Sequence, residues 1–500
     1  MKKSAKCLFF FLIFFLVSDR GAFAFNLAGE VRSLTLSNGM LWLVVHRPSV
    51  PVFSGLVMVK AGGLDEAMGK TGLAHMFEHM AFKGSKRIGT RNYAKEAPLL
   101  KKIAELGLAM SEEQQKANPD AEKIAALKQQ IQQLTQEEYQ YMVKNEVWKI
   151  LSVKGAEDLN AFTTKDVTAY HASMPVPVFP VWADVTSEMV FYPVLREFYQ
   201  ERDVVMEERR LRYDNSPYGF LFENLVQTAF PDGPYHSSPI GFPKDLVGLT
   251  MQDAGAFHRR HYIPQNMVGV LVGDITVERA KEVLEKTFGN VKKTSKSLDS
   301  GFRRNDKRDF AFQGEVRKIV KFPSEPYLVI AFHKPAAPSR ADYVFDLIDG
   351  IACEGRTGRM TLKLVKELKM ASSVSCSNGF PGSRLDNLFV VYASPIKGHS
   401  LEKLEKAILG ELDLLARKVA ISDLKRVKDQ IVYNFFWGLE DNMELAEQLA
   451  QAQTVVGDWR YVVTFQKKIE SIGAEEVMQT AQKYFQPDNR VVLYLERGNR

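Results

Sequence analysis

Two histidines four residues apart, with a glutamate beside the second, form the clearest chemical signal in the sequence. They are His75 and His79 with Glu78, within the segment Gly72–Gly84. On an α-helix, positions i and i+4 share one face, so both imidazoles can reach one metal ion. Glu78 lies next to that face, where a carboxylate can hold a metal-bound water whose pKa zinc lowers towards ~7. This HxxEH order is typical of inverted zinc-peptidase motifs.

The same residues are also compatible with an ordinary solvated face of an amphipathic helix. The flanking residues favour a metal, because Met76, Phe77, Met80 and Phe82 make the segment largely apolar. Polar groups in apolar surroundings are costly unless they are paired or bind a metal. A catalytic zinc takes three protein ligands and leaves its fourth position to water, so we expect a further His, Asp or Glu downstream.

Candidates for the third ligand occur in the run ERDVVMEE at residues 201–208. Together with the HxxEH segment, this run resembles the M16 peptidases, the relatives of pitrilysin and insulinase, and in particular their processing-peptidase branch. The resemblance implies that Glu208 is the third ligand of one zinc ion per chain, and that Glu201 steadies a ligand histidine. Residues 201 and 208 are two helical turns apart on one face. The adjacent Glu207 is the main ambiguity, although it should point elsewhere.

Length and composition describe an ordinary globular protein of more than one domain. Five hundred residues are too many for one hydrophobic core. Hydrophobic residues make up 45% and charged residues 25%, as is usual. The net charge of +6 comes with no basic stripe interleaved with aromatic residues, so we expect no nucleic-acid partner.

Residues 1–24 have the pattern of an export signal. A basic stretch ending at Lys6 precedes the apolar run Leu8–Val17, which is too short to span a bilayer, and an Ala-Phe-Ala cleavage pattern ends at Ala24. We predict cleavage after Ala24, and a periplasmic or secreted protein with no membrane association afterwards. An uncleaved anchor is the alternative.

Two cysteines, Cys353 and Cys376, remain after such a cleavage. In an oxidising compartment they could form a disulfide. Their sequence separation does not show whether the two Cα atoms come within bonding range, so pairing stays open. They have no neighbouring ligand residues and are not expected to form a zinc site.

Strand and helix signals alternate along the first half. Residues 32–47 predict a β-hairpin around Asn38-Gly39, since Asn-Gly between β-rich runs favours a tight turn. Val52–Ala61 is expected to be the next strand. Residues 96–150 instead carry apolar residues at spacings of three and four, interrupted near Pro119, and predict a helical hairpin.

The hairpin is interpreted as a coiled-coil arm, with a partner-binding arm as the alternative. It also accounts for a departure from the family, because the interval between His79 and Glu208 is longer than M16 enzymes usually show. An insertion of about this size restores the usual spacing.

The stretch from Leu159 to Thr164 resembles the N-A-x-T strand of the M16 family. There, an edge strand lines the cleft and pairs with the substrate backbone. The resemblance implies that Asn160 and Ala161 bind an extended peptide by β-strand addition. An ordinary core strand is the alternative.

The polar residues 293–315 are interpreted as a linker between an N-terminal domain, 25–292, and a C-terminal domain, 316–500. The second half repeats the element order of the first but contains no HxxEH, so we expect no metal there. The resemblance implies an α+β fold of two homologous halves. Each half would hold an antiparallel-rich sheet with helices, and the hairpin would be inserted in the first.

In the M16 family, the second half carries an arginine and a tyrosine that bind substrate. The Gly-rich stretch around Gly358 places Arg359 at the arginine position, whereas Ser372 stands where tyrosine is expected. In processing-type enzymes one chain can carry the metal and a second chain the Arg/Tyr pair. This chain is therefore expected to be the metal-bearing member of a homodimer, or of a heterodimer with a metal-free M16 subunit.

These features predict a zinc-dependent endopeptidase that hydrolyses extended or unfolded peptides in an enclosed chamber. Glu78 would act as general base and then as general acid. The alternative is a non-catalytic peptide-binding or assembly subunit with the same fold, and a metal-storage or metal-sensing protein is a third possibility. Retention of the complete motif favours the enzyme.

Overall fold

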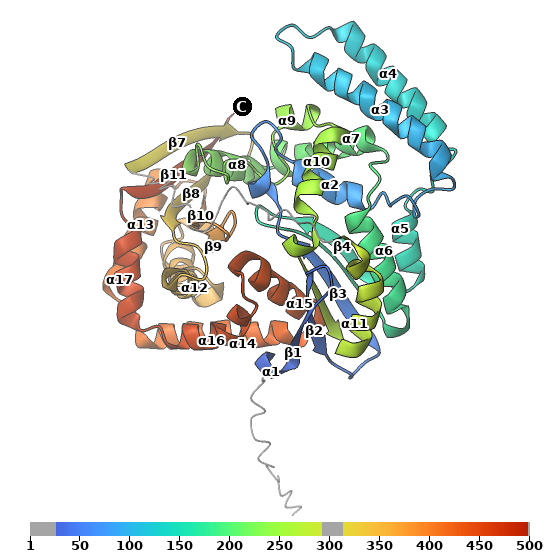
Figure 1. Cartoon of the computed structure of the whole chain (residues 1–500). Helices are drawn as coiled ribbons and strands as arrows, with labels where there is room; N and C mark the ends of the chain where they lie inside the picture. The colour runs from blue at the N-terminus through green and yellow to red at the C-terminus, as the bar shows by residue number, and fades with distance from the viewer. Residues whose placement is uncertain (1–26, 293–313, 499–500) are drawn as a thin grey trace, which may run out of the picture.

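The computed structural model describes residues 27–292 and 314–498. The predicted signal segment and most of the predicted linker lie outside these residues. The described chain contains two β-sheets with helices around them, and each sheet is built by strands from one half of the sequence (Figure 1). This is the predicted α+β class with two similar halves. None of the described helices combines the length and the apolarity needed to cross a membrane.

The elements are as follows. The strands are β1 (Val31–Thr35), β2 (Leu41–His46), β3 (Val52–Val59), β4 (Glu157–Thr163), β5 (Thr168–Pro175), β6 (Met267–Gly273), β7 (Gly314–Phe322), β8 (Tyr327–Lys334), β9 (Ala371–Phe380), β10 (Asn387–Pro395) and β11 (Asn489–Arg497). The α-helices are α1 (Leu27–Glu30), α2 (Leu73–Ala81), α3 (Tyr93–Gln114), α4 (Ala121–Glu138), α5 (Glu146–Val153), α6 (Phe179–Phe191), α7 (Phe198–Arg209), α8 (Pro217–Ala229), α9 (Pro243–Val247), α10 (Met251–His261), α11 (Val277–Lys286), α12 (Arg340–Ala352), α13 (Leu401–Arg417), α14 (Ile421–Glu440), α15 (Asn442–Gln451), α16 (Arg460–Glu470) and α17 (Ala474–Tyr484).

The two sheets share one topology. The first has the order β1-β2-β6-β3-β5-β4 and the second β7-β11-β8-β10-β9. In each sheet one pair is parallel, β2 with β6 and β7 with β11, and the other pairs are antiparallel. Five strands therefore correspond one to one, with β4 and β9 as equivalent edge strands.

Local sequence patterns predicted most of the strands. The predicted hairpin is confirmed as β1 and β2, with Gly39 in the left-handed region at φ 90°. Strand β7 was not predicted, and it begins inside the range assigned to the linker. It is an edge strand in which four of the nine residues are charged and five are exposed. Charged side chains are common on sheet edges, where they oppose pairing with other chains, and this composition hid the strand.

A helix from each half packs on the sheet of the other half. Leu445 of α15, from the second half, shares a buried cluster with Leu56 of β3 and Val270 of β6 in the first sheet. In the opposite direction, Leu221 of α8 packs in a buried cluster with Val329 of β8. Both helices lie between the halves in Figure 1. Because burial of such surface drives folding, the exchange joins the two halves into one molecule.

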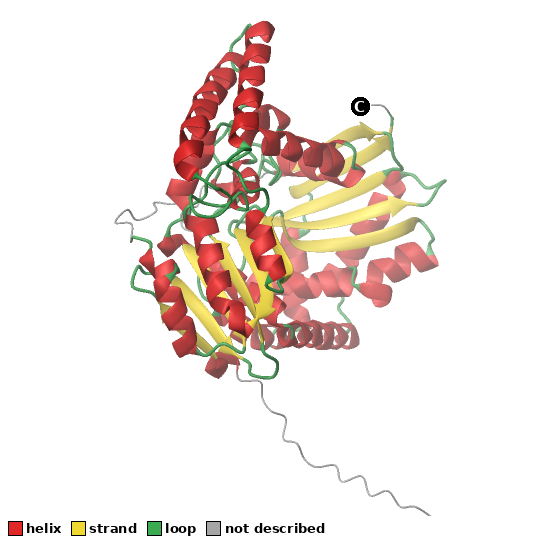
Figure 2. Ribbon diagram, turned by 90° about the vertical axis from the view of Figure 1, so that its right-hand side faces the viewer, coloured by secondary structure: helices red, strands yellow, loops and turns green. Residues whose placement is uncertain are grey.

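Helices α3 and α4 form an antiparallel pair that projects from the first half (Figures 1 and 2). The helical hairpin predicted for residues 96–150 is confirmed, although α5 occupies the end of that range. At Gly107 of α3, an added Cβ would lie 1.6 Å from the hydroxyl oxygen of Tyr199 in α7. The Ser111 hydroxyl donates to the carbonyl of Gly248 at 2.8 Å. The arm is thus packed closely against the helix that carries Glu201 and Glu208.

Polar contacts also join the halves. Arg384 of the second half donates to Asp65 at 2.6 Å and to the backbone carbonyl of Asp166 at 3.1 Å. Both side chains of the Arg384–Asp65 pair are at least nine-tenths buried. Within the second half, a disulfide joins Cys353 to Cys376, with the Cα atoms 5.6 Å apart. It ties the residue after α12 to the edge strand β9.

Candidate metal centre

A tight glycine turn starts the helix that carries the two histidines. Gly72 adopts φ 87°, and a Cβ there would lie 2.4 Å from the carbonyl oxygen of Ile240, so only glycine fits. The Glu66 carboxylate accepts the backbone N–H groups of Gly72 and Ala74 at 2.9 and 2.7 Å. It stabilises the start of α2, where helix N–H groups lack partners. Burial raises the pKa of Glu66 to about 8.

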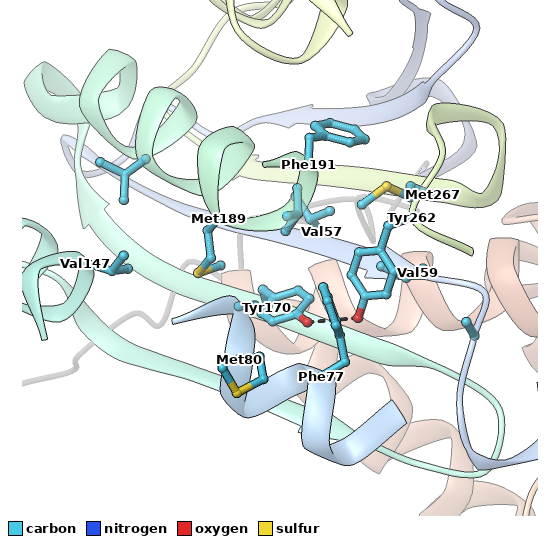
Figure 3. Close-up of a cluster of buried hydrophobic side chains, with 14 of the residues drawn as sticks. Val57, Val59, Phe77, Met80, Val147, Tyr170, Met189, Phe191, Tyr262 and Met267 are labelled. Carbon is cyan, nitrogen blue, oxygen red and sulfur yellow. Dashed lines mark hydrogen bonds between the residues drawn. The ribbon is translucent and has the colours of Figure 1, made fainter. Parts of the chain in front are cut away.

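The apolar face of α2 fixes the direction of its polar face. Phe77 and Met80 are fully buried and lie among side chains of the first sheet (Figure 3). Above them in Figure 3, the hydroxyl groups of Tyr170 and Tyr262 are hydrogen-bonded at 2.9 Å. His75 and His79 are four residues apart and share one face of α2. Phe77 and Met80 project from another side of the helix, so their burial in the core turns the two histidines away from the sheet.

Helix α7 brings the third predicted ligand to the histidines. Its inner side is held by Arg202, which donates to the carbonyls of Val247 and Leu249 at 2.7 and 3.2 Å. Oε2 of Glu208 then lies 3.7 Å from Nε2 of His75 and 3.5 Å from Nε2 of His79. Glu207 faces outward, with its side chain 64% exposed and paired with Arg210.

The three side chains fit a catalytic zinc ion. One donor atom from each of His75, His79 and Glu208 lies within 4.8 Å of the others, and within residues 27–292 and 314–498 this is the one such group of three or more His, Cys, Asp or Glu. Ligands about 2.1 Å from zinc at tetrahedral corners are about 3.4 Å apart, close to the distances found. Two imidazoles and one carboxylate leave one position for water, as catalytic zinc requires.

Glu201 contacts the second histidine as predicted, with Oε2 3.3 Å from Nδ1 of His79. Its other oxygen accepts from Lys83, a contact that the sequence did not indicate, and Lys83 also reaches Glu197 at 3.1 Å. Burial alone would lower the pKa of His79, but hydrogen bonds to Glu201 and Glu208 outweigh it and raise the pKa to about 9. A metal on Nε2 would take the place of the proton that faces Glu208, while Nδ1 would keep its contact with Glu201.

The environment of His75 is different. Burial, aided by the positive charge of His79, lowers the pKa of His75 to about 4. Its imidazole is therefore neutral near pH 7, the form that binds metals. His75 is therefore already in the protonation state of a metal ligand, whereas His79 is oriented by carboxylates.

Glu78 lies beside the group and has one strong partner. The Thr163 hydroxyl, at the end of β4, donates to its Oε2 at 2.5 Å. Burial raises the pKa of Glu78, and the hydrogen bond from Thr163 opposes this shift. The contact joins residues 85 positions apart, so spacing in the sequence gave no sign of it.

Asn160 and Ala161 lie on the edge strand β4, opposite His171 and Tyr170 of β5. Among the described strands, β4 has β5 as its only neighbour in the sheet. The Ala161 N–H donates to the side-chain oxygen of Asn160 at 2.9 Å. This backbone donor is therefore held by a side chain rather than by a neighbouring strand.

Arg359 is engaged within the second half. It donates to the carbonyl of Lys418 at 3.0 Å and lies 3.8 Å from Glu411. No hydrogen bond or ion pair in the described part of the chain joins it to the metal group, and its substrate role stays a prediction. Ser372 is exposed on β9 and donates to the carbonyl of Ser394 at 3.2 Å.

Arg212 is a further residue at the site that sequence reasoning missed. Its Nη2 lies 3.0 Å from Oε1 of Glu208. The two residues are four apart at a helix end, a spacing at which opposite charges meet, so the sequence did contain a usable signal.

Two family models match the chain. One, described as Insulinase (Peptidase family M16), matches residues 43–117, and the other, described as Peptidase M16 inactive domain, matches residues 248–431. The chain belongs to the M16 peptidase family. The first match contains His75, Glu78 and His79, whereas Glu208 lies between the two matched segments.

Two relatives match this chain over most of its length. It is 24% identical over 469 residues to the zinc protease PqqE of Helicobacter pylori, covering 93% of this chain and 92% of the relative. It is 22% identical to the mitochondrial-processing peptidase subunit beta of Lentinula edodes, with 93% and 91% covered.

Solved structures show the same fold. The crystal structure of a protease from Helicobacter pylori matches with a TM-score of 0.77 at 23% identity, over 93% of this chain and 99% of that one. The periplasmic protease PqqL from Escherichia coli matches with a TM-score of 0.66 at 14% identity, over 93% of this chain and 47% of the other. Each of the two similar sheets therefore belongs to one of the two homologous halves of an M16 fold.

Proposed function

We propose that this protein is a zinc-dependent endopeptidase that hydrolyses extended or unfolded peptides. In this proposal His75, His79 and Glu208 hold one zinc ion, Glu201 orients His79, and Glu78 is the catalytic carboxylate. Zinc protease relatives support the use of zinc. The donor set and its distances support this particular group of residues.

The position of β4 carries the proposal. Among the described strands, β4 has a neighbour on one side only, and its last residue, Thr163, hydrogen-bonds to Glu78. An extended peptide that pairs with β4 would therefore run directly beside Glu78 and the metal group. Pairing at Ala161 would replace the hydrogen bond that its N–H now makes to Asn160. A strand that binds peptide backbone beside a metal ligand set suits proteolysis better than metal storage.

The chain's own residues supply binding and proton transfer. Bound zinc would polarise the scissile carbonyl and acidify a water molecule. Thr163 holds Oε2 of Glu78, so Oε1 takes the proton of the attacking water and later delivers it to the leaving nitrogen. Burial raises the pKa of Glu78, which suits a group that must both accept and donate a proton.

We further propose a periplasmic or secreted location and a second M16 subunit. Residues 1–24 have the export pattern, the Cys353–Cys376 disulfide suits an oxidising compartment, and one structural relative is titled a periplasmic protease. One relative is named as a subunit. A partner chain, either a second copy or a metal-free relative, would complete an enclosed chamber and supply the tyrosine that Ser372 replaces.

A non-catalytic subunit is the second candidate, because the family model over residues 248–431 is described as an inactive domain. That segment lies outside His75–Glu208, which retains the whole motif, so we favour the enzyme.

The test is cleavage of an unstructured peptide by the mature chain before and after zinc removal. We expect a chelator to abolish cleavage and zinc to restore it, with internal fragments identified by mass spectrometry. Glu208→Gln should weaken zinc binding at least ~10-fold, because it replaces a charged ligand, whereas Glu207→Gln should leave it unchanged. The opposite ranking would move the third ligand to Glu207, and chelator-resistant cleavage would refute a zinc enzyme.

A further inference from the structure

The two oxygens of the Glu208 carboxylate have different partners. Oε2 faces the two histidines at 3.7 and 3.5 Å, as described above. Oε1 faces away from them and lies 3.0 Å from Nη2 of Arg212. The Glu208 side chain is only 19% exposed, so its orientation is set by these partners and by packing rather than by solvent.

The turn that carries Arg212 is fixed against α8. After α7 the chain makes a π-helical turn, Arg210–Asp214, a feature often found at functional sites. A Cβ at Gly219 of α8 would lie 1.9 Å from the carbonyl oxygen of Arg212, so the two backbones are in direct contact. Arg209 also binds Glu223 of α8 through two hydrogen bonds, of 2.5 and 2.6 Å. Arg212 therefore projects from a rigid backbone.

Three arginines lie close together here, and each has a different carboxylate partner. Arg209 is directed to Glu223, and Arg210 pairs with the exposed Glu207 on the outer side. Arg212 alone among the three pairs with the predicted metal ligand. Arg210 is therefore a matched control, since it lies on the same turn and forms an ion pair of the same kind.

We propose that Arg212 is a positioning residue that holds Oε1 of Glu208, so that Glu208 binds zinc through Oε2 alone. This proposal rests on the zinc site proposed above. A carboxylate can bind a metal through one oxygen or through both. A second Glu208 oxygen on the metal would crowd the position that a catalytic zinc leaves to water and would raise the number of ligands from four to five. Hydrogen-bond partners of ligands commonly tune metal sites in this way.

Exposure distinguishes this role from a structural one. The Arg212 side chain is 68% exposed, and exposed ion pairs add little to folding stability. Its replacement should therefore leave the thermal unfolding temperature unchanged while altering the metal site. A residue needed mainly for folding would show the reverse.

The experiment uses the full mature chain loaded with Co²⁺, whose visible absorption weakens when the number of ligands rises from four to five. We expect Arg212→Gln to lower the absorption intensity and to reduce peptide cleavage by about 10–100-fold, the range seen for partners of metal ligands. Arg210→Gln should match the wild type. Arg212→Lys, which retains a cation at this position, should restore most of the spectrum.

An Arg212→Gln spectrum identical to that of the wild type would overturn the proposal, as would equal changes in Arg212→Gln and Arg210→Gln. A wild-type chain that takes up no Co²⁺ or Zn²⁺ would instead refute the metal site itself. The two failures are therefore distinguishable in one set of spectra.

Discussion

Glu138, at the end of α4, is a buried acidic side chain of the first half. It is fully buried at the base of the arm, and neither of its carboxylate oxygens has a hydrogen-bond partner among the described residues. Glu96 nearby is already paired with Arg196 at 2.5 Å. Burial, together with the negative charge of Glu96, raises the pKa of Glu138 to about 8.

This pKa predicts a stability that depends on pH. It lies above the ordinary value of 4.5, so between about pH 4.5 and 8 the folded chain keeps a proton that the unfolded chain releases. Stability from Glu138 therefore falls as pH rises through that window. Glu138→Gln, a neutral isostere, should raise the free energy of unfolding by about 4 kcal/mol at pH 8 and by less than about 1 kcal/mol at pH 5.

Urea denaturation at both pH values measures the effect. The exposed Glu137→Gln is the control and should change stability at neither pH. Equal gains for Glu138→Gln at the two pH values would show that the carboxylate is ionised in the folded protein throughout.

Single residues of the site differed in how far sequence could predict them. His75, Glu78 and His79 lie within one helical turn, so spacing alone predicted their grouping. Glu208 needed the resemblance, because its distance from the histidines in the chain is set by the inserted arm. Thr163 lies at the end of β4, 85 residues after Glu78, and no local pattern indicates that the two side chains are in contact.

At the level of elements, the docking of the arm against α7 depends on one glycine. Gly107 lies where a Cβ would meet the Tyr199 hydroxyl. We expect Gly107→Ala to destabilise the protein by about 1–3 kcal/mol through overpacking. Zinc affinity should also fall, because Tyr199 lies on the helix that carries Glu208.

Gly410 in the middle of α13 is the matched control. It is exposed, and an added Cβ there would meet no atom within 4 Å. Gly410→Ala should therefore stabilise by up to about 1 kcal/mol, since alanine favours helix. Denaturation of both variants tests the contrast, and a stabilising Gly107→Ala would mean that α3 does not lie against Tyr199.

Elements with strong periodic signals were predicted well, and those defined by their neighbours were not. The Asn38-Gly39 turn and the apolar spacing of the arm carry their own local information. Strand β7 mixes charged and apolar residues, and it is a strand because β11 pairs with it. Its partner lies near the other end of the half, beyond the reach of local reasoning.

For the whole molecule, the buried Arg384–Asp65 pair links the two halves close to the start of α2. Arg384→Met leaves Asp65 and Asp166 without this partner, and breaking a buried pair costs about 3–5 kcal/mol. We expect a clear fall in the thermal unfolding temperature. Arg417→Met is the control, because its pair with Asp413 is exposed on both sides and should contribute at most about 1 kcal/mol.

Calorimetry of both variants checks this prediction. Equal unfolding temperatures for Arg384→Met and Arg417→Met would mean that the halves are held by their apolar contacts alone. Those contacts, the exchange of α8 and α15 between the halves, could not be predicted from sequence. They pair surfaces from distant segments, whereas the repeated order of elements along the chain was predicted, except for β7.

The most direct test of the zinc endopeptidase is to compare wild type and Glu78→Gln in the mature chain. Both proteins are loaded with zinc, and cleavage of one unstructured peptide is followed. The account predicts equal zinc content and a loss of cleavage of about 10²–10⁴-fold in Glu78→Gln, the usual contribution of a general base. Full activity in Glu78→Gln, with zinc bound, would contradict the mechanism.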